Sequence, residues 1–61
     1  MDRVLKDLRA MTGLSQKAFG EWLNIPVRTI EQWETGRRKP PEYVVELIEY
    51  KVRREYNGRQ D

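Results

Sequence analysis

The sequence predicts an all-α fold: a single small bundle of four helices, or five. Apolar residues recur at spacings of three and four, and glycines and prolines interrupt them at intervals that suit short helices. No segment alternates apolar and polar residues with the period of a strand. A chain of 61 residues is long enough for one domain with a modest core. We expect this domain at residues 1–56 and a disordered tail at 57–61.

The first two helices are predicted from an apolar stripe and from residues that favour helix ends. The stripe lies within residues 2–11, and Gly13 is suited to end the helix in a left-handed conformation. The stripe consists of Val4, Leu5, Leu8 and Met11. Ser15 is a favourable N-cap for a second helix, which we expect to end at Leu23.

The third and fourth helices are predicted from the same kinds of signal. Asn24 tolerates a left-handed turn, and Pro26 suits the first position of a helix over residues 26–35, which Gly36 ends. A last helix is expected over residues 41–56. Its apolar side consists of Val44, Val45, Leu47, Ile48 and Val52.

The segment 16–35 has the features of two short helices that cross at a large angle around a tight turn. Gly20 is a small residue where the helices approach, and a glycine inside a helix costs ~1 kcal/mol relative to alanine. Asn24 suits the turn. Apolar residues at the places that fill the angle are Phe19, Leu23, Ile25, Ile30 and Trp33. We expect Trp22 and Trp33 to belong to the core and not to stack on bases.

Two stretches of the chain resemble the Xre/Cro-cI-type helix-turn-helix family of phage and bacterial repressors. They read LSQKAF from Leu14 to Phe19 and IEQWETGRRKP from Ile30 to Pro40. The resemblance covers residues 5–48 and implies a lambda-repressor-like fold. It also implies a double-stranded DNA-binding protein whose third helix enters the major groove, usually as a homodimer on a palindrome. The chain departs from the family pattern at Pro26, where many members carry Ser or Thr.

The outward face of the third helix is the predicted site of base readout. With Ile30 and Trp33 directed inward, this face consists of Val27, Arg28, Glu31 and Gln32. Arginine prefers guanine, glutamine can bridge adenine, and valine can pack on a thymine methyl group. Glu31 has two interpretations: it accepts a hydrogen bond from cytosine, or it pairs with Arg28 or a lysine.

Phosphate contacts are expected on both sides of that helix. Gln16 lies at the start of the second helix, where the helix dipole favours an anion. A basic run follows the third helix, and such a local cluster suits specific binding although the net charge is only +2. The full set is Gln16, Lys17, Thr29, Thr35, Arg37, Arg38 and Lys39. A solvated side chain is an equally good interpretation for Lys17.

Two further groups of residues have predicted roles away from the bases. The resemblance implies a structural ion pair between Arg9 and Glu34, which border apolar neighbours. On the last helix, Tyr43 and Tyr50 lie seven residues apart, hence on one face, and form either a dimer surface or the rim of the core. The possible dimer surface consists of Tyr43, Tyr50, Val52 and Tyr56.

Composition makes an enzyme improbable. The chain has no cysteine and no histidine, which excludes thiolate and imidazole metal sites, Cys–His nucleophiles and Ser-His-Asp triads. No run of aliphatic residues exceeds two, so a membrane span is not expected. We expect no metal, cofactor or small-molecule substrate.

The predicted function is sequence-specific transcriptional regulation, most simply repression by occupying an operator. Such a protein is expected in the cytoplasm, associated with the nucleoid. The alternative is an antitoxin-like or other protein-interaction module whose last helix binds a partner protein. Its acidic edge would serve that role and consists of Glu42, Glu46 and Glu49. RNA binding is disfavoured, because the deep, narrow major groove of A-form RNA excludes a helix.

Overall fold

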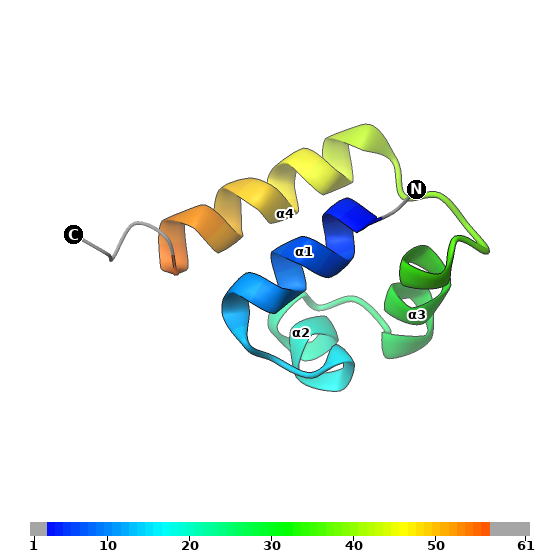
Figure 1. The fold of residues 1–61 in the computed structure, drawn as a ribbon, viewed down its shortest axis with the longest axis horizontal. Helices are drawn as coiled ribbons and strands as arrows, with labels where there is room; N and C mark the ends of the chain where they lie inside the picture. Colours follow the sequence, from blue (N-terminus) through cyan, green and yellow to red (C-terminus); the bar gives the residue numbers. More distant parts are fainter. Residues whose placement is uncertain (1–2, 57–61) are drawn as a thin grey trace.

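The computed structural model describes residues 3–56, which form four α-helices and the turns that join them. The helices are α1 (Arg3–Thr12), α2 (Gln16–Leu23), α3 (Val27–Thr35) and α4 (Glu42–Glu55). α1 lies in the middle, with α4 along one side and with α2 and α3 on the other (Figure 1). The predicted all-α fold with four helices is confirmed, and the tail predicted at 57–61 lies outside the described residues.

The helices begin and end close to the predicted residues. Pro26 and Pro41 precede α3 and α4 as N-caps, not as first helical residues, because their ψ angles of 140° and 146° are extended. α1 includes Thr12, one residue beyond the predicted end. The Thr12 hydroxyl donates to the Arg9 carbonyl at 2.7 Å and accepts the Leu14 N–H at 3.0 Å, which fixes the turn into α2.

The turns use the residues that the sequence indicated for them. Gly13 and Gly36 have φ angles of 74° and 85°, and Asn24 has φ 64°, so all three occupy the left-handed region. Ser15 caps α2, because its hydroxyl oxygen accepts the Ala18 N–H at 3.1 Å. These backbone conformations set the angles at which successive helices leave the turns.

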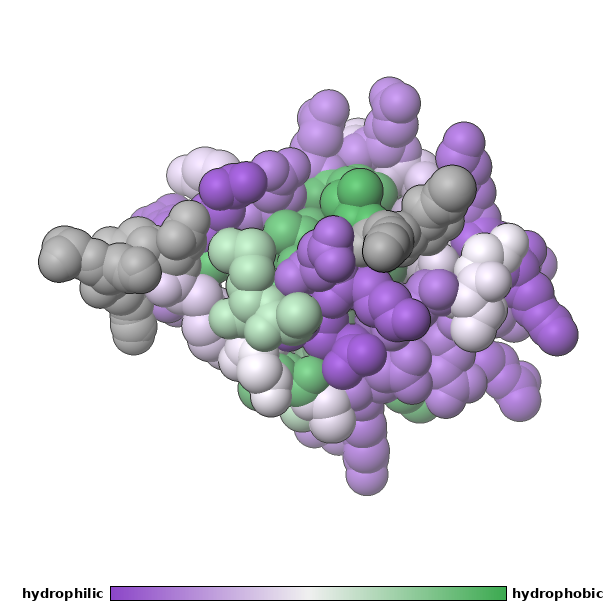
Figure 2. Space-filling model, viewed as in Figure 1, coloured by the Kyte–Doolittle hydropathy of each residue, from purple (hydrophilic) through white to green (hydrophobic). Residues whose placement is uncertain are grey.

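The core combines side chains from all four helices. Its buried members are Leu5 and Leu8 of α1, Phe19 of α2, Ile30 of α3, and Ile48 and Val52 of α4. Part of each predicted apolar stripe lies outside it: Val4 is 52% exposed and Leu47 is 63% exposed. Figure 2 shows apolar side chains gathered along the seam between α1 and α4, framed by hydrophilic ones.

The last turns of α4 correct the predicted dimer surface. Val52 is fully buried, so it cannot contact a second molecule and that part of the prediction is wrong. Tyr56 packs edge-on against Trp22, with ring centroids 5.5 Å apart, and Lys51 lies 4.8 Å above the same indole ring. Tyr56 therefore anchors the end of α4 on α2, whereas Tyr43 and Tyr50 remain exposed.

Candidate DNA-binding surface

The pairing of α2 with α3 depends on a close approach at Gly20. A Cβ atom at this position would lie 2.6 Å from the carbonyl oxygen of Ile25, too close for any side chain. The Ile25 N–H also donates to the Gly20 carbonyl at 2.8 Å. The turn between the helices is thus held against α2 by a backbone contact that only glycine permits, and this contact sets the direction of α3.

α3 divides its side chains between the core and the surface. Ile30 is fully buried and Trp33 packs against the core, while Val27, Arg28 and Glu31 are exposed. Gln32 is half-buried, one turn after Arg28 on the same face. A shallow hollow of about 480 Å³ lies along this face, lined by Arg28, Glu31, Gln32, Thr35 and Arg37. Three of the four predicted readout residues therefore share one polar hollow.

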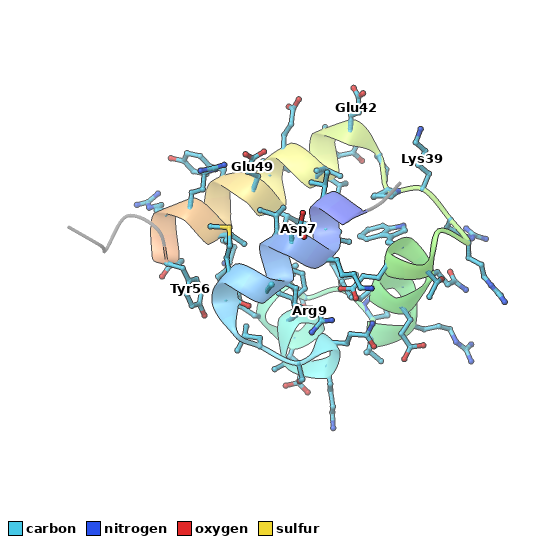
Figure 3. All side chains as sticks on the ribbon, viewed as in Figure 1. Asp7, Arg9, Lys39, Glu42, Glu49 and Tyr56 are labelled. Carbon is cyan, nitrogen blue, oxygen red and sulfur yellow. The ribbon has the colours of Figure 1, made fainter. Side chains whose placement is uncertain are left out.

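The basic run after α3 separates into two parts. The N–H groups of Arg37 and Arg38 both donate to the Gln32 carbonyl, at 3.0 and 3.2 Å, which holds this segment against the end of α3. Arg37 then lines the same hollow as Arg28. Lys39 instead lies beside α4 and extends away from α3, at the same end of the molecule as Glu42 (Figure 3). Of these two predicted phosphate contacts, Arg37 is therefore the one that lies beside the outward face of α3.

The remaining predicted phosphate contacts differ in how available they are. Lys17 is exposed, and Thr29 is half-buried. The Thr35 hydroxyl donates to the Gln32 carbonyl at 3.3 Å, so its proton is already used within the helix. A phosphate contact by Thr35 would require this bond to break.

An ion pair joins α1 to α3. Arg9 donates to both carboxylate oxygens of Glu34: its Nε to Oε2 at 2.8 Å and its Nη2 to Oε1 at 3.1 Å. A third bond runs from Arg9 Nη1 to the Leu14 carbonyl at 3.1 Å. The Glu34 side chain is 2% exposed and that of Arg9 is 23% exposed. The Arg9–Glu34 pair expected from the sequence is present and ties the start of the α1–α2 turn to α3.

Gln16 belongs to this network, which the sequence did not indicate. Its Nε2 donates to Glu34 Oε1 at 3.0 Å, so the first residue of α2 is held directly by the last turns of α3. Helical periodicity relates residues of one helix and gives no information on a pair 18 positions apart across a turn. The bond orients the Gln16 amide while its second N–H stays available for a phosphate oxygen.

Burial and hydrogen bonding act in opposite directions on the pKa of Glu34. Burial is the largest effect and raises the pKa, but it is outweighed by the hydrogen bonds from Arg9 and Gln16 and the positive charges of Arg9 and Lys6. The pKa of Glu34 is therefore below its ordinary value. The hydrogen bond to Glu34 raises the pKa of Arg9, although partial burial acts in the opposite direction. The pair stays ionised at neutral pH.

Residues 3–56 contain no cluster of three or more acidic side chains arranged to hold a metal ion. Within the same residues, no helix is both long and apolar enough to cross a membrane.

Two short helices locked at a glycine, with an exposed polar helix and basic side chains after it, define a helix-turn-helix DNA-binding domain. The family model described as "Helix-turn-helix domain" matches residues 3–50 of the chain. The chain therefore belongs to the helix-turn-helix domain family, in agreement with the resemblance to Xre/Cro-cI-type repressors. Comparisons with curated proteins and with solved structures gave no match.

Proposed function

We propose that this chain is a sequence-specific double-stranded DNA-binding regulator that represses transcription by occupying a palindromic operator. The observation that carries the proposal is the exposed polar face of α3, with Arg28 and Gln32 one turn apart along a shared hollow. The buried side of α3, with Ile30 in the core, leaves this face as the part of the helix free to enter a major groove.

Arg28 and Gln32 are proposed to read adjacent base pairs. Arg28 projects from the first turn of α3, where helix-turn-helix proteins contact base edges, and it would bind the O6 and N7 atoms of guanine. Gln32 would bridge N6 and N7 of adenine. Val27 is 37% exposed, enough to contact a thymine methyl group. Glu31 is proposed to accept from cytosine N4, since no ion pair with Arg28 appears among the described residues.

Phosphate contacts on either side would hold the helix in register. Gln16 and Lys17 begin α2, at the positive end of its dipole, and Arg37 and Arg38 follow α3. Each phosphate neutralised contributes about −0.9 to the slope of log K against log salt concentration. A domain of this kind needs no catalytic group to repress, because an occupied operator excludes polymerase. We place its action in the cytoplasm, on the nucleoid.

A selection of bound sequences from a random duplex pool tests the proposal. The expected result is a single motif with two inverted half-sites, their centres about one helical turn or ~10 bp apart. Recovery of no motif, together with binding weaker than ~10⁻⁴ M at physiological salt, would refute it, because that is below ordinary non-specific affinity. The protein-interaction alternative would then be favoured.

Three alanine variants separate readout from positioning. Arg28→Ala is expected to cost ~1–3 kcal/mol on the selected operator and to flatten the preference at one base pair. Arg37→Ala should weaken binding about equally on operator and scrambled duplex and reduce the salt slope by roughly 1. Lys39→Ala is the matched control: it removes the same charge on the α4 side and should reduce the slope by less.

These variants are compared by titrating both duplexes at several salt concentrations. If Arg28→Ala weakens operator and scrambled DNA equally, α3 is not the reading helix. If Lys39→Ala lowers the salt slope as much as Arg37→Ala, the phosphate contacts extend to the α4 side of the segment.

A further inference from the structure

An exposed stripe runs along α4 on the side opposite the core. Tyr43, Leu47 and Tyr50 lie at positions i, i+4 and i+7 of one helix, so they share a face. Their exposed fractions are 67%, 63% and 64%, in a helix whose buried side chains, Ile48 and Val52, point the other way. Three large, exposed side chains in line are not needed for the fold, and such a patch marks a site of association.

The charges on the edge of this stripe change sign along the helix. Glu42 and Glu46 lie in the first half of α4, and Lys51, Arg53 and Arg54 lie in the second half, between Glu49 and Glu55. Glu46 and Arg53 border the same edge of the stripe, seven residues apart. A partner with the reversed order of charge along its contact helix would complement this pattern, and an antiparallel second copy of α4 has that order.

We propose that the stripe Tyr43–Leu47–Tyr50 is the surface on which a second copy of this chain docks, with the two α4 helices antiparallel. In that arrangement Leu47 of each copy packs against Tyr50 of the other, and Glu46 of each copy lies beside Arg53 of the other. A parallel pair would place Arg54 against Arg54 and bring like-charged ends together. The antiparallel order pairs the two apolar stripes and places Glu46 of each copy beside Arg53 of the other.

Arg53 is able to take this second partner. It already binds Glu49 of its own helix, at 3.0 Å, but 55% of its side chain remains exposed. A guanidinium group has five N–H donors, so the contacts of Nε and Nη2 with Glu49 Oε2 leave other donors for a carboxylate from a neighbouring molecule. Glu46 is exposed as well.

The size of the stripe implies that the dimer is weak without DNA. A buried aromatic side chain covers ~150–250 Å², and two tyrosines and a leucine that are about two-thirds exposed offer roughly 300–400 Å² per copy. The total of ~600–800 Å² is below the ~1,200 Å² of a stable interface. Two copies on adjacent half-sites meet at an effective concentration on the order of millimolar, where such a contact forms. The dimer on DNA therefore rests on the proposed function, whereas weak self-association in solution does not.

The test measures self-association and DNA cooperativity separately. Sedimentation equilibrium of the full chain, up to about millimolar concentration, should show a weak monomer–dimer equilibrium that Leu47→Asp abolishes. On a duplex with two half-sites, Leu47→Asp should reduce the cooperativity of binding at least about tenfold, because cooperativity depends on contact between the two copies. Its affinity for a single half-site should be unchanged. Met11→Asp is the control, because Met11 is 43% exposed on α1, outside the stripe; it should behave like the wild type.

The orientation is tested by exchanging charges. Glu46→Arg and Arg53→Glu should each weaken self-association several-fold, and the double variant should recover it. A double variant no better than either single one would overturn the antiparallel arrangement.

The surface itself is refuted if the wild type stays monomeric at the highest concentration and binds two half-sites independently. It is also refuted if Leu47→Asp keeps the wild-type cooperativity, or if Leu47 is needed only for a complex with a different protein. Failure of the proposed function has a different signature, namely no specific DNA binding with self-association still present in sedimentation.

Discussion

Removal of the Glu34 carboxylate is the most direct test of how this small domain holds α3 in place. Glu34→Ala takes away the acceptor of three side-chain donors: Nε and Nη2 of Arg9, and Nε2 of Gln16. The Arg9 guanidinium then keeps its hydrogen bond to the Leu14 carbonyl at 3.1 Å. A positive charge that is mostly shielded from water loses its counter-charge, which is costlier than losing an exposed pair.

The burial of the two partners sets the expected magnitude. Breaking a fully buried ion pair costs 3–5 kcal/mol, roughly. Here the carboxylate is 2% exposed but Arg9 is 23% exposed, so water can resolvate part of the stranded guanidinium. About 2 kcal/mol is therefore expected. A chain of 61 residues has a total stability of about 3–9 kcal/mol, so the loss would be a large share of it.

Urea unfolding followed by circular dichroism measures this loss. With an m-value of about 1 kcal/mol/M for a domain of this size, the midpoint should fall by about 2 M. Glu49→Ala is the matched control: it also breaks a Glu–Arg pair, but one whose side chains are 41% and 55% exposed. The control should shift the midpoint by less than about 0.5 M, because exposed pairs contribute little.

An unchanged midpoint for Glu34→Ala would refute the reasoning, since it would mean that the ion pair adds nothing to stability. Equal losses in Glu34→Ala and Glu49→Ala would also contradict it, because burial would then not be the deciding factor. Single half-site DNA binding gives a second readout: the loss of the Gln16–Glu34 bond should weaken operator and scrambled duplex alike, as expected for a positioning contact.

Four further results are expected. The wild type should lose stability as pH falls from about 5 through 4.5, because Glu34 protonates at its ordinary pKa of 4.5 in the unfolded state and only below that pH in the folded state. Thermal melts at several pH values measure this loss, and the melting temperature of Glu34→Gln should depend less on pH. Gly20→Ala should lower the urea midpoint by about 1–3 M, since the new Cβ would meet the Ile25 carbonyl oxygen at 2.6 Å, and a rise would show that helix propensity outweighs the clash. Ser15→Ala should cost about 1 kcal/mol in the same assay through loss of the α2 cap, while full retention of stability would mean that water replaces the hydroxyl. Val52→Ala should cost about 2 kcal/mol as a core truncation, and a cooperativity loss without destabilisation would return Val52 to the dimer surface.

The helices and turns follow from the sequence because their causes are local. Left-handed residues at Gly13, Asn24 and Gly36 end three helices where the chain has a residue that tolerates φ > 0. The apolar period identified most of the core, including Phe19 and Ile30. The family resemblance added the Arg9–Glu34 pair, which periodicity alone does not predict.

Tertiary structure decided which part of each apolar stripe is buried. A helix with one or two neighbours buries a narrow strip, so Val4 and Leu47 are left at the surface while Val52 lies at the centre. Spacing along one helix gives the direction of the apolar side but not its width, because the width depends on how neighbouring helices cross. The sequence therefore did not show that Leu47 would be exposed on α4, beside Tyr43 and Tyr50.

The candidate site likewise has one part that the sequence predicted and one part that only the tertiary structure decided. The sequence placed Val27, Arg28, Glu31 and Gln32 on the outward face of α3, since a single helix fixes their relative directions. Only the fold joined Gln16 to Glu34 across two helices, and only the fold turned Lys39 toward α4 while Arg37 stayed beside the reading face. Contacts between elements depend on crossing angles and on the path of the loop after α3, and local sequence determines neither.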